Sequence, residues 1–121
     1  MPVLTMHTTG DGLVEVTDEQ AYASVVKKAG DSKLLRQVFV HRAGHCTFTP
    51  AETIAAFQAL NTRMLTGKWK GFGPTPLNAA AFALGNDYNV LYLNGNPVYT
   101  MPEFEQFQPL MLLRPFDGFS Q

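Results

Sequence analysis

The chain has 121 residues, enough for one domain and too few for two, and its 45% hydrophobic content is ordinary for a globular protein. Its formal net charge of -1 argues against nucleic acid as a partner, because phosphate binding needs a basic surface. No apolar run approaches the roughly 18 residues of a membrane span, and the first residues lack the basic region of a signal peptide. The single cysteine allows no disulfide within the chain, so the cysteine content does not indicate an oxidising or a reducing compartment. A signal peptide on an upstream part would make the protein secreted.

Residues 2–8 are apolar and rich in Val, Leu and Thr, which predicts a buried strand that the Gly10-Asp11-Gly12 turn ends. Residues 17–20 have the pattern of a capping box, with Thr17 as the predicted N-cap of a helix. The apolar residues that follow share one helical stripe, and Gly30 is expected to end the helix. The stripe consists of Ala21, Tyr22, Val25, Val26 and Ala29.

Residues 34–40 predict a second buried strand, which runs to residues 41–44. Thr49 and Glu52 form a second capping box that begins another helix, with proline at its first position. The predicted apolar face of this helix is formed by Ile54, Phe57, Leu60 and Met64, and Gly67 is expected to end it. Strand, helix, strand and helix in this order predict an α/β fold, with a parallel sheet covered on both faces.

Two strands alone cannot form such a sheet, because their outer edges would have unpaired backbone groups. The chain also begins directly in a predicted strand, whereas most chains begin with a few disordered residues. Both features indicate that another chain or a second copy of this chain completes the fold.

The last third differs in character. Residues 71–75 predict a linker, and residues 76–84 a short helix with Thr75 as N-cap and Gly85 as its end. Asn94-Gly95 predicts a hairpin turn between residues 88–93 and 97–101. Residues 109–119 are apolar and proline-rich and are expected to extend across a surface. Met101, Met111 and residues 110–113 are expected to bury against another segment. We therefore expect one domain with two segments. Residues 1–70 form the α/β segment, and residues 71–121 form the short helix, the hairpin and the apolar tail.

Two residues that could carry acid–base chemistry follow the two predicted strands. Asp11 follows the first strand and His45 follows the second, where ligands bind in open α/β sheets. If the two residues lie side by side, the Asp11 carboxylate would fix the imidazole tautomer of His45 and stabilise its protonated form. Flanking glycines, Gly10, Gly12 and Gly44, would let the backbone turn at both places.

These residues carry a resemblance to a known family. Residues 2–14, an apolar strand that runs to Gly10-Asp11-Gly12, are similar to the penultimate-strand region of serine α/β-hydrolases. Residues 38–46, with Gly44-His45, look like the final strand of that fold and its catalytic base. The resemblance implies that Asp11 is the acid and His45 the base of a Ser-Asp-His triad, in the chain order of the fold. It implies no metal and no organic cofactor.

The Gly-x-Ser-x-Gly nucleophile motif of the family is absent from the sequence. No serine can replace it by position, since Ser24 is predicted within a helix, Ser32 in a loop and Ser120 at the end of the chain. Cys46 adjoins His45, but neighbouring side chains on an extended segment point apart. Cys46 therefore has three alternative roles, a small buried residue, half of a disulfide to another segment, or a reactive thiol. Tannase and feruloyl-esterase relatives have a similar His-Cys pair, which suggests the second role.

Other residues are assigned structural roles. His7 is expected to be packed or hydrogen-bonded within its strand, His41 to lie near the surface, and Glu52 to cap a helix. The aromatic residues Trp69, Phe72 and Tyr88 either line a cleft or simply pack.

The leading hypothesis is that the chain is part of a serine hydrolase that cleaves carboxylic esters or related acyl compounds. It would supply Asp11 and His45 and depend on a partner segment for the serine, as a proteolytic half, an expressed fragment or one member of a split enzyme. One alternative is a non-catalytic protein that is derived from the hydrolase fold and could form a homodimer. Another is a small ligand-binding domain in which Asp11 and His45 are incidental.

Overall fold

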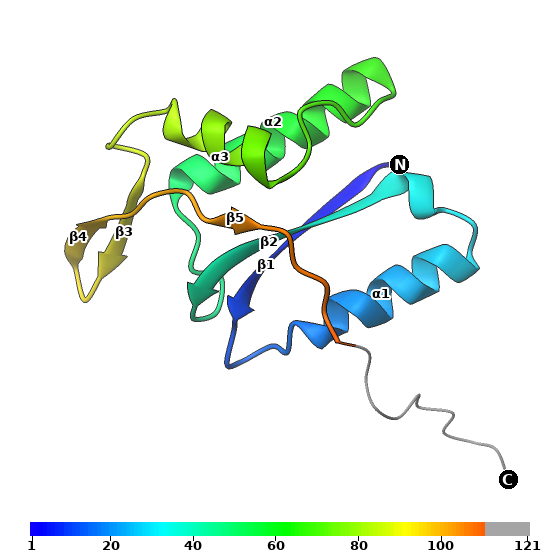
Figure 1. Ribbon diagram of the computed structural model, residues 1–121, viewed down its shortest axis with the longest axis horizontal. Coiled ribbons are helices and arrows are strands. Elements are labelled where there is room, and N and C mark those ends of the chain that lie inside the picture. Colours follow the sequence, from blue (N-terminus) through cyan, green and yellow to red (C-terminus); the bar gives the residue numbers. More distant parts are fainter. Residues whose placement is uncertain (111–121) are drawn as a thin grey trace, which may run out of the picture.

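The computed structural model describes residues 1–110, as a small sheet between two layers of helices with a separate hairpin at one end (Figure 1). The predictions for residues 111–113, Met111 included, and for most of the expected tail 109–119 lie outside the described residues. The elements in chain order are β1 (Val3–Gly10), α1 (Thr17–Lys28), η1 (Ser32–Leu34), β2 (Leu35–Ala43), α2 (Pro50–Thr66), α3 (Pro74–Phe82), β3 (Val90–Leu93), β4 (Asn96–Tyr99) and β5 (Phe104–Glu105).

The three-stranded sheet has the order β1-β2-β5. The two long strands are parallel, in a register that runs from Val3 opposite Leu35 to Thr8 opposite Val40. The short β5 is antiparallel and pairs with the other edge of β2. The predicted α/β class and the two parallel neighbours are confirmed, but the sheet is mixed, because the antiparallel β5, which was not predicted, adds to the edge of β2.

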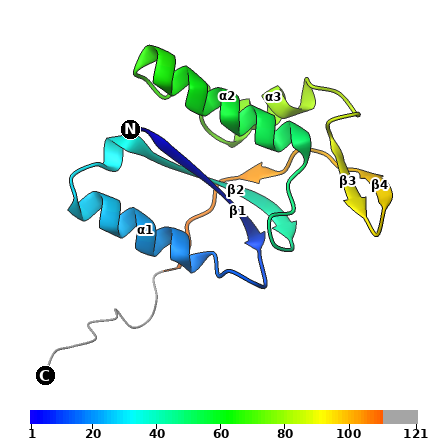
Figure 2. The ribbon, with the colours of Figure 1, turned by 180° about the vertical axis from the view of Figure 1, so that it is seen from behind.

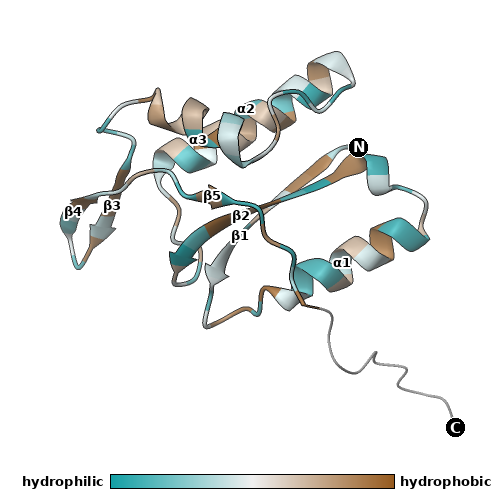
Figure 3. Cartoon of the chain, viewed as in Figure 1, coloured by the Kyte–Doolittle hydropathy of each residue, from teal (hydrophilic) through white to brown (hydrophobic). Residues whose placement is uncertain are grey.

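The helices cover the two faces of this sheet, α1 on one and α2 with α3 on the other (Figures 1 and 2). The core lies on the α2–α3 side and comprises Val38, Val40, Ala51, Ala55, Ala56, Ala59, Leu77, Ala81 and Phe104. By contrast, α1 has no buried residue, and its predicted apolar stripe includes the exposed side chains of Tyr22 and Val25. Figure 3 shows α1 as a mostly hydrophilic helix with an apolar stretch in its middle.

The predicted apolar face of α2 is wrong for two of its four residues. Phe57 and Met64 are 68% and 63% exposed, while the helix packs on the sheet through its alanines and Glu52. Alanine side chains let a helix backbone come close to the strands beneath it. The large apolar residues at neighbouring positions then point away from the sheet.

The two predicted capping boxes have different outcomes. At α2, Thr49 accepts a hydrogen bond from the Glu52 amide and the Glu52 carboxylate accepts one from the Thr49 amide, as predicted. At α1, the N-cap is Val16 and no side chain caps the helix. Thr17 is the first helical residue, and its hydroxyl lies 3.3 Å from a Glu15 carboxylate oxygen.

The last third contains the predicted helix and hairpin with shifted boundaries, and it also contains β5, which was not predicted. The helix α3 begins at Pro74, so that Gly73 and not Thr75 is its N-cap. The helix ends at Phe82 with Ala83 as its C-cap, and not at Gly85. The hairpin β3–β4 turns at Asn94-Gly95, and both residues have positive φ angles, as a type I′ turn requires. None of the helices in the described part of the chain combines the length and the hydropathy that a membrane crossing needs.

Candidate active site

The Asp11 side chain is held by the turn that follows β1. Its Oδ1 accepts hydrogen bonds from the amides of Leu13 at 2.8 Å and Val14 at 3.0 Å. The Val14 amide is the largest cause that lowers the Asp11 pKa to about 2; burial opposes this shift, while the Leu13 amide and His45 add to it. The side chain is only 3% exposed. Asp11 is therefore an ionised carboxylate at neutral pH, and its second oxygen is left for another donor.

That donor is His45, in the loop after β2. The distance between His45 Nδ1 and Asp11 Oδ2 is 2.7 Å, across 34 residues of sequence. Since an ionised carboxylate can only accept, Nδ1 carries the proton and the neutral ring has its lone pair on Nε2. The imidazole is 42% exposed. The arrangement can therefore take a proton from an outside hydroxyl at Nε2 while Asp11 holds the other side of the ring.

Backbone contacts join the ends of the two strands that carry this pair. The Gly44 amide donates to the Gly10 carbonyl at 3.0 Å, and the Thr8 hydroxyl donates to the Gly44 carbonyl. A Cβ on Gly10 would lie 3.0 Å from the Ala43 Cα, so glycine permits this close approach. Gly44 has a φ of +101°, which places it in a region that L side chains rarely adopt. Gly10 thus allows the close approach of the two strand ends, and Gly44 allows the turn after β2.

Cys46 does not fit the first of its predicted roles, because it is exposed. Its Sγ lies 3.5 Å from His45 Nε2, so the expectation that the two side chains point apart is also wrong. The physical reason is the backbone of Cys46, whose φ of +52° is left-handed and not extended. Whether Cys46 pairs with another segment remains a prediction.

The described serines take no part in this site. Ser24 lies within α1, where its hydroxyl donates to the Gln20 carbonyl. Ser32 begins η1, which precedes β2, whereas His45 follows the other end of that strand. Ser120 lies outside the described residues. Within residues 1–110, the side chain that faces the Nε2 of His45 is that of Cys46.

The other two histidines have the predicted structural roles. His7 is buried in β1, with its Nδ1 2.9 Å from the Thr8 carbonyl. His41 is exposed near the end of β2, with its Nδ1 3.3 Å from the Glu105 carboxylate.

Arg42, which lies three residues before His45, was not predicted to belong to the site. Its guanidinium binds the fully buried Glu52 carboxylate through both terminal nitrogens, at 2.6 and 2.9 Å. Glu52 is thus both a capping residue, as predicted, and half of an ion pair. No sequence signal indicated this partner, because the predicted apolar face of α2 did not include Glu52.

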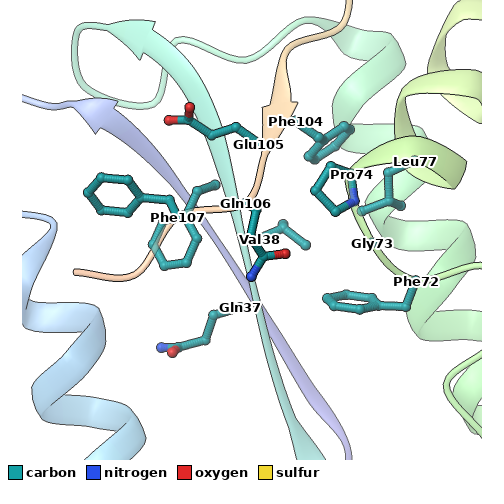
Figure 4. A pocket seen from close by; sticks show the side chains of 11 residues that line it. Gln37, Val38, Phe72, Gly73, Pro74, Leu77, Phe104, Glu105, Gln106 and Phe107 are labelled. Atoms are coloured by element: carbon teal, nitrogen blue, oxygen red, sulfur yellow. The ribbon is translucent and has the colours of Figure 1, made fainter.

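A pocket of about 230 Å³ lies elsewhere, beside the middle of β2 (Figure 4). Figure 4 shows Phe72, Pro74, Leu77 and Phe104 on one side of it and Phe107 on the other. Neither Asp11 nor His45 lines this pocket. Of the three aromatic residues considered from the sequence, Phe72 lines it.

The other two aromatic residues lie outside that pocket. Trp69 packs edge-on against Phe72 and lies under the guanidinium groups of Arg36 and Arg63. Tyr88 is 47% exposed. Met101 is 63% exposed and Leu110 is 81% exposed, so neither is buried by the described part of this chain, and their burial against a partner segment stays a prediction.

Comparison with known proteins gives one informative similarity. The chain is 33% identical to o-phthalyl amidase from Xanthobacter agilis over 108 residues, which cover 88% of this chain and 23% of that protein. The chain thus spans less than a quarter of the length of this curated relative. No protein-family model and no solved structure matches the chain.

Proposed function

We propose that this chain is part of a hydrolase of acyl compounds, in which His45 is the general base and Asp11 orients it. The observation that carries the proposal is the 2.7 Å contact between His45 Nδ1 and Asp11 Oδ2 at the end of two parallel strands. The similarity to o-phthalyl amidase supports the reaction class, since an amidase cleaves an acyl–nitrogen bond.

In this proposal a serine hydroxyl from a segment outside this chain approaches His45 Nε2. The imidazole takes the hydroxyl proton as the oxygen attacks the acyl carbon, and Asp11 stabilises the imidazolium. The imidazolium then gives the proton to the leaving nitrogen or oxygen, and a water molecule releases the acyl group by the same two steps. The partner segment would also supply the backbone amides that bind the oxyanion.

Two arguments support an outside nucleophile. The described serines have other positions in the fold, and the relative is more than four times as long as the matched region. Esters and amides are both candidate substrates, because the same acid–base steps act on either. The name of the relative favours an amide of an aromatic acid.

The test is a chimera in which this chain replaces the matched 108 residues of o-phthalyl amidase. Hydrolysis of a phthalyl amide and of p-nitrophenyl acetate is measured, together with labelling by a fluorophosphonate probe. We expect His45→Gln and Asp11→Asn to reduce turnover by about 10³-fold or more, as loss of a triad member does. His41→Gln, a change of the same kind at an exposed histidine of β2, is the matched control.

Full activity of the His45→Gln chimera would refute the assignment of the base. Labelling of a serine in the isolated chain would refute the outside nucleophile. An active chimera that cleaves only the ester or only the amide decides between the two substrate classes.

A further inference from the structure

We propose that the buried ion pair Arg42–Glu52 is a positioning device, which holds the loop of residues 43–48 so that the imidazole of His45 meets Asp11. This inference rests on the proposed function in one respect only, that His45 is the base. The geometric claim itself concerns this chain alone.

Glu52 forms the fixed centre of the device. Its side chain is fully buried, and its two oxygens together accept four hydrogen bonds. Two come from the Arg42 guanidinium, one from the Thr49 amide at 2.9 Å and one from the Glu103 amide at 3.0 Å. The carboxylate thus joins the end of β2, the start of α2 and the segment that leads into β5.

Arg42 connects this centre to the loop. The nitrogen that binds Glu52 at 2.6 Å also donates to the Thr47 carbonyl at 2.9 Å. Arg42 precedes the loop and Thr47 lies near its end, so one guanidinium group fixes both sides of the segment that carries His45. The Arg42 side chain is only 9% exposed, which restricts its freedom to leave this position.

The loop has few other anchors. The backbone of Gly44 is bonded to β1, through Gly10 and Thr8. Beyond Gly44, the described hydrogen bonds of residues 45–47 stay within the loop, apart from those to Asp11 and Arg42. The Arg42–Thr47 contact is therefore the backbone tether of the half of the loop that follows His45.

A stabilising role alone does not account for the pair. A capping box works with a neutral glutamine as well as with glutamate, and a buried ion pair often stabilises a fold no more than apolar side chains would. What the charged pair adds is a planar fork, which binds a carboxylate and a carbonyl oxygen at the same time. Lysine has no such fork.

The experiment measures the Nδ1 proton of His45 by NMR in the complete chain, through its chemical shift and its exchange rate with water. Arg42→Met would leave Glu52 as an uncompensated buried charge and can unfold the chain, so two milder variants are used. Arg42→Lys keeps the positive charge and removes the fork. Glu52→Gln keeps the capping box and removes the buried carboxylate charge, which leaves Arg42 only the more exposed Glu103 carboxylate, 3.3 Å away.

We expect both folded variants to exchange the Nδ1 proton at least tenfold faster than the wild type, with a shift toward the position of a solvent-exposed imidazole. Arg36→Lys, the same change at the other end of β2, is the matched control and should leave the signal unchanged. Cooperative thermal unfolding shows that each variant is folded.

An unchanged Nδ1 proton in either folded variant would overturn the inference. The result is separable from the proposed function, because the NMR signal needs no nucleophile and no substrate. A chimera without activity whose His45 signal still depends on Arg42 would refute the hydrolase proposal and leave the positioning device intact.

Discussion

Replacing Gly44 by alanine tests whether the turn before His45 has the geometry described above. A Cβ at this position would overlap the Thr47 Oγ1, and the backbone φ is +101°. Both features predict a loss of stability. They do so for different reasons, which can be measured separately.

The magnitude follows from the two terms. A left-handed backbone costs an L residue about 1–2 kcal/mol. The contact with Thr47 Oγ1 is relieved if that side chain moves away from its staggered position or to another rotamer, which costs about 0.5–1.5 kcal/mol. The hydroxyl gives up only a weak hydrogen bond to the His45 carbonyl, at 3.4 Å. We therefore expect Gly44→Ala to reduce the free energy of unfolding by about 1.5–3.5 kcal/mol.

The assay is urea unfolding followed by far-UV circular dichroism, for Gly44→Ala, Thr47→Ala and the double variant. The double variant removes the contact and keeps the strained backbone, so about 1 kcal/mol of the loss should be recovered. Gly12→Ala is the matched control in the Asp11 turn, since a Cβ there meets nothing within 4 Å and φ is not positive. An equal effect of Gly44→Ala and Gly12→Ala would refute the reasoning.

Three further predictions concern the acid, the cap and the surface. Because the Asp11 pKa is lowered from 3.8 to about 2, its stabilising contribution is present above pH 4 and lost as the pH falls through 2. The difference in unfolding free energy between wild type and Asp11→Asn should therefore shrink from pH 6 to pH 2 in urea titrations, and a constant difference would contradict this. Thr49→Ala should lower the free energy of unfolding by about 1–2 kcal/mol, since it leaves the Glu52 amide without its acceptor; an unchanged urea midpoint would argue against the cap. Phe57→Gln should change the free energy of unfolding by less than about 0.5 kcal/mol, while Ala59→Gln on the packed side of α2 unfolds the chain, and the reverse order would show that the predicted apolar face was right.

The meeting of Asp11 and His45 could be predicted because it depends on two regular features. Carboxyl ends of adjacent parallel strands lie at the same edge of a sheet, and the apolar pattern marks where each strand ends. In the observed sheet, where Thr8 lies opposite Val40, Asp11 directly follows β1 and His45 lies two residues after β2. Strand ends that are clear in the sequence thus fix the approximate place of the site.

The contacts that refine this site could not be predicted in the same way. The left-handed backbone of Cys46 has no sequence signal such as glycine or asparagine. The Arg42–Glu52 pair depends on how the start of α2 lies over the end of β2, which no local pattern specifies. The packed face of α2 was misjudged for a similar reason, since hydrophobicity shows which residues avoid water but not how closely the helix approaches the sheet.

The acid and the base of the pair are therefore positioned by different means. The amides of Leu13 and Val14 hold Asp11, so its negative charge is fixed by two consecutive amides of its own turn and His45 is only a secondary cause of its low pKa. The carboxylate thus remains charged whether the imidazole is neutral or protonated, as the stabilisation of an imidazolium requires. His45 is not held by amides of its own turn. Its loop is bonded to β1 at Gly44 and is tethered at Thr47 by Arg42, which the buried Glu52 carboxylate holds. Substitutions in the Asp11 turn should consequently alter the charge of the acid, whereas substitutions at Arg42 should alter the place of the base.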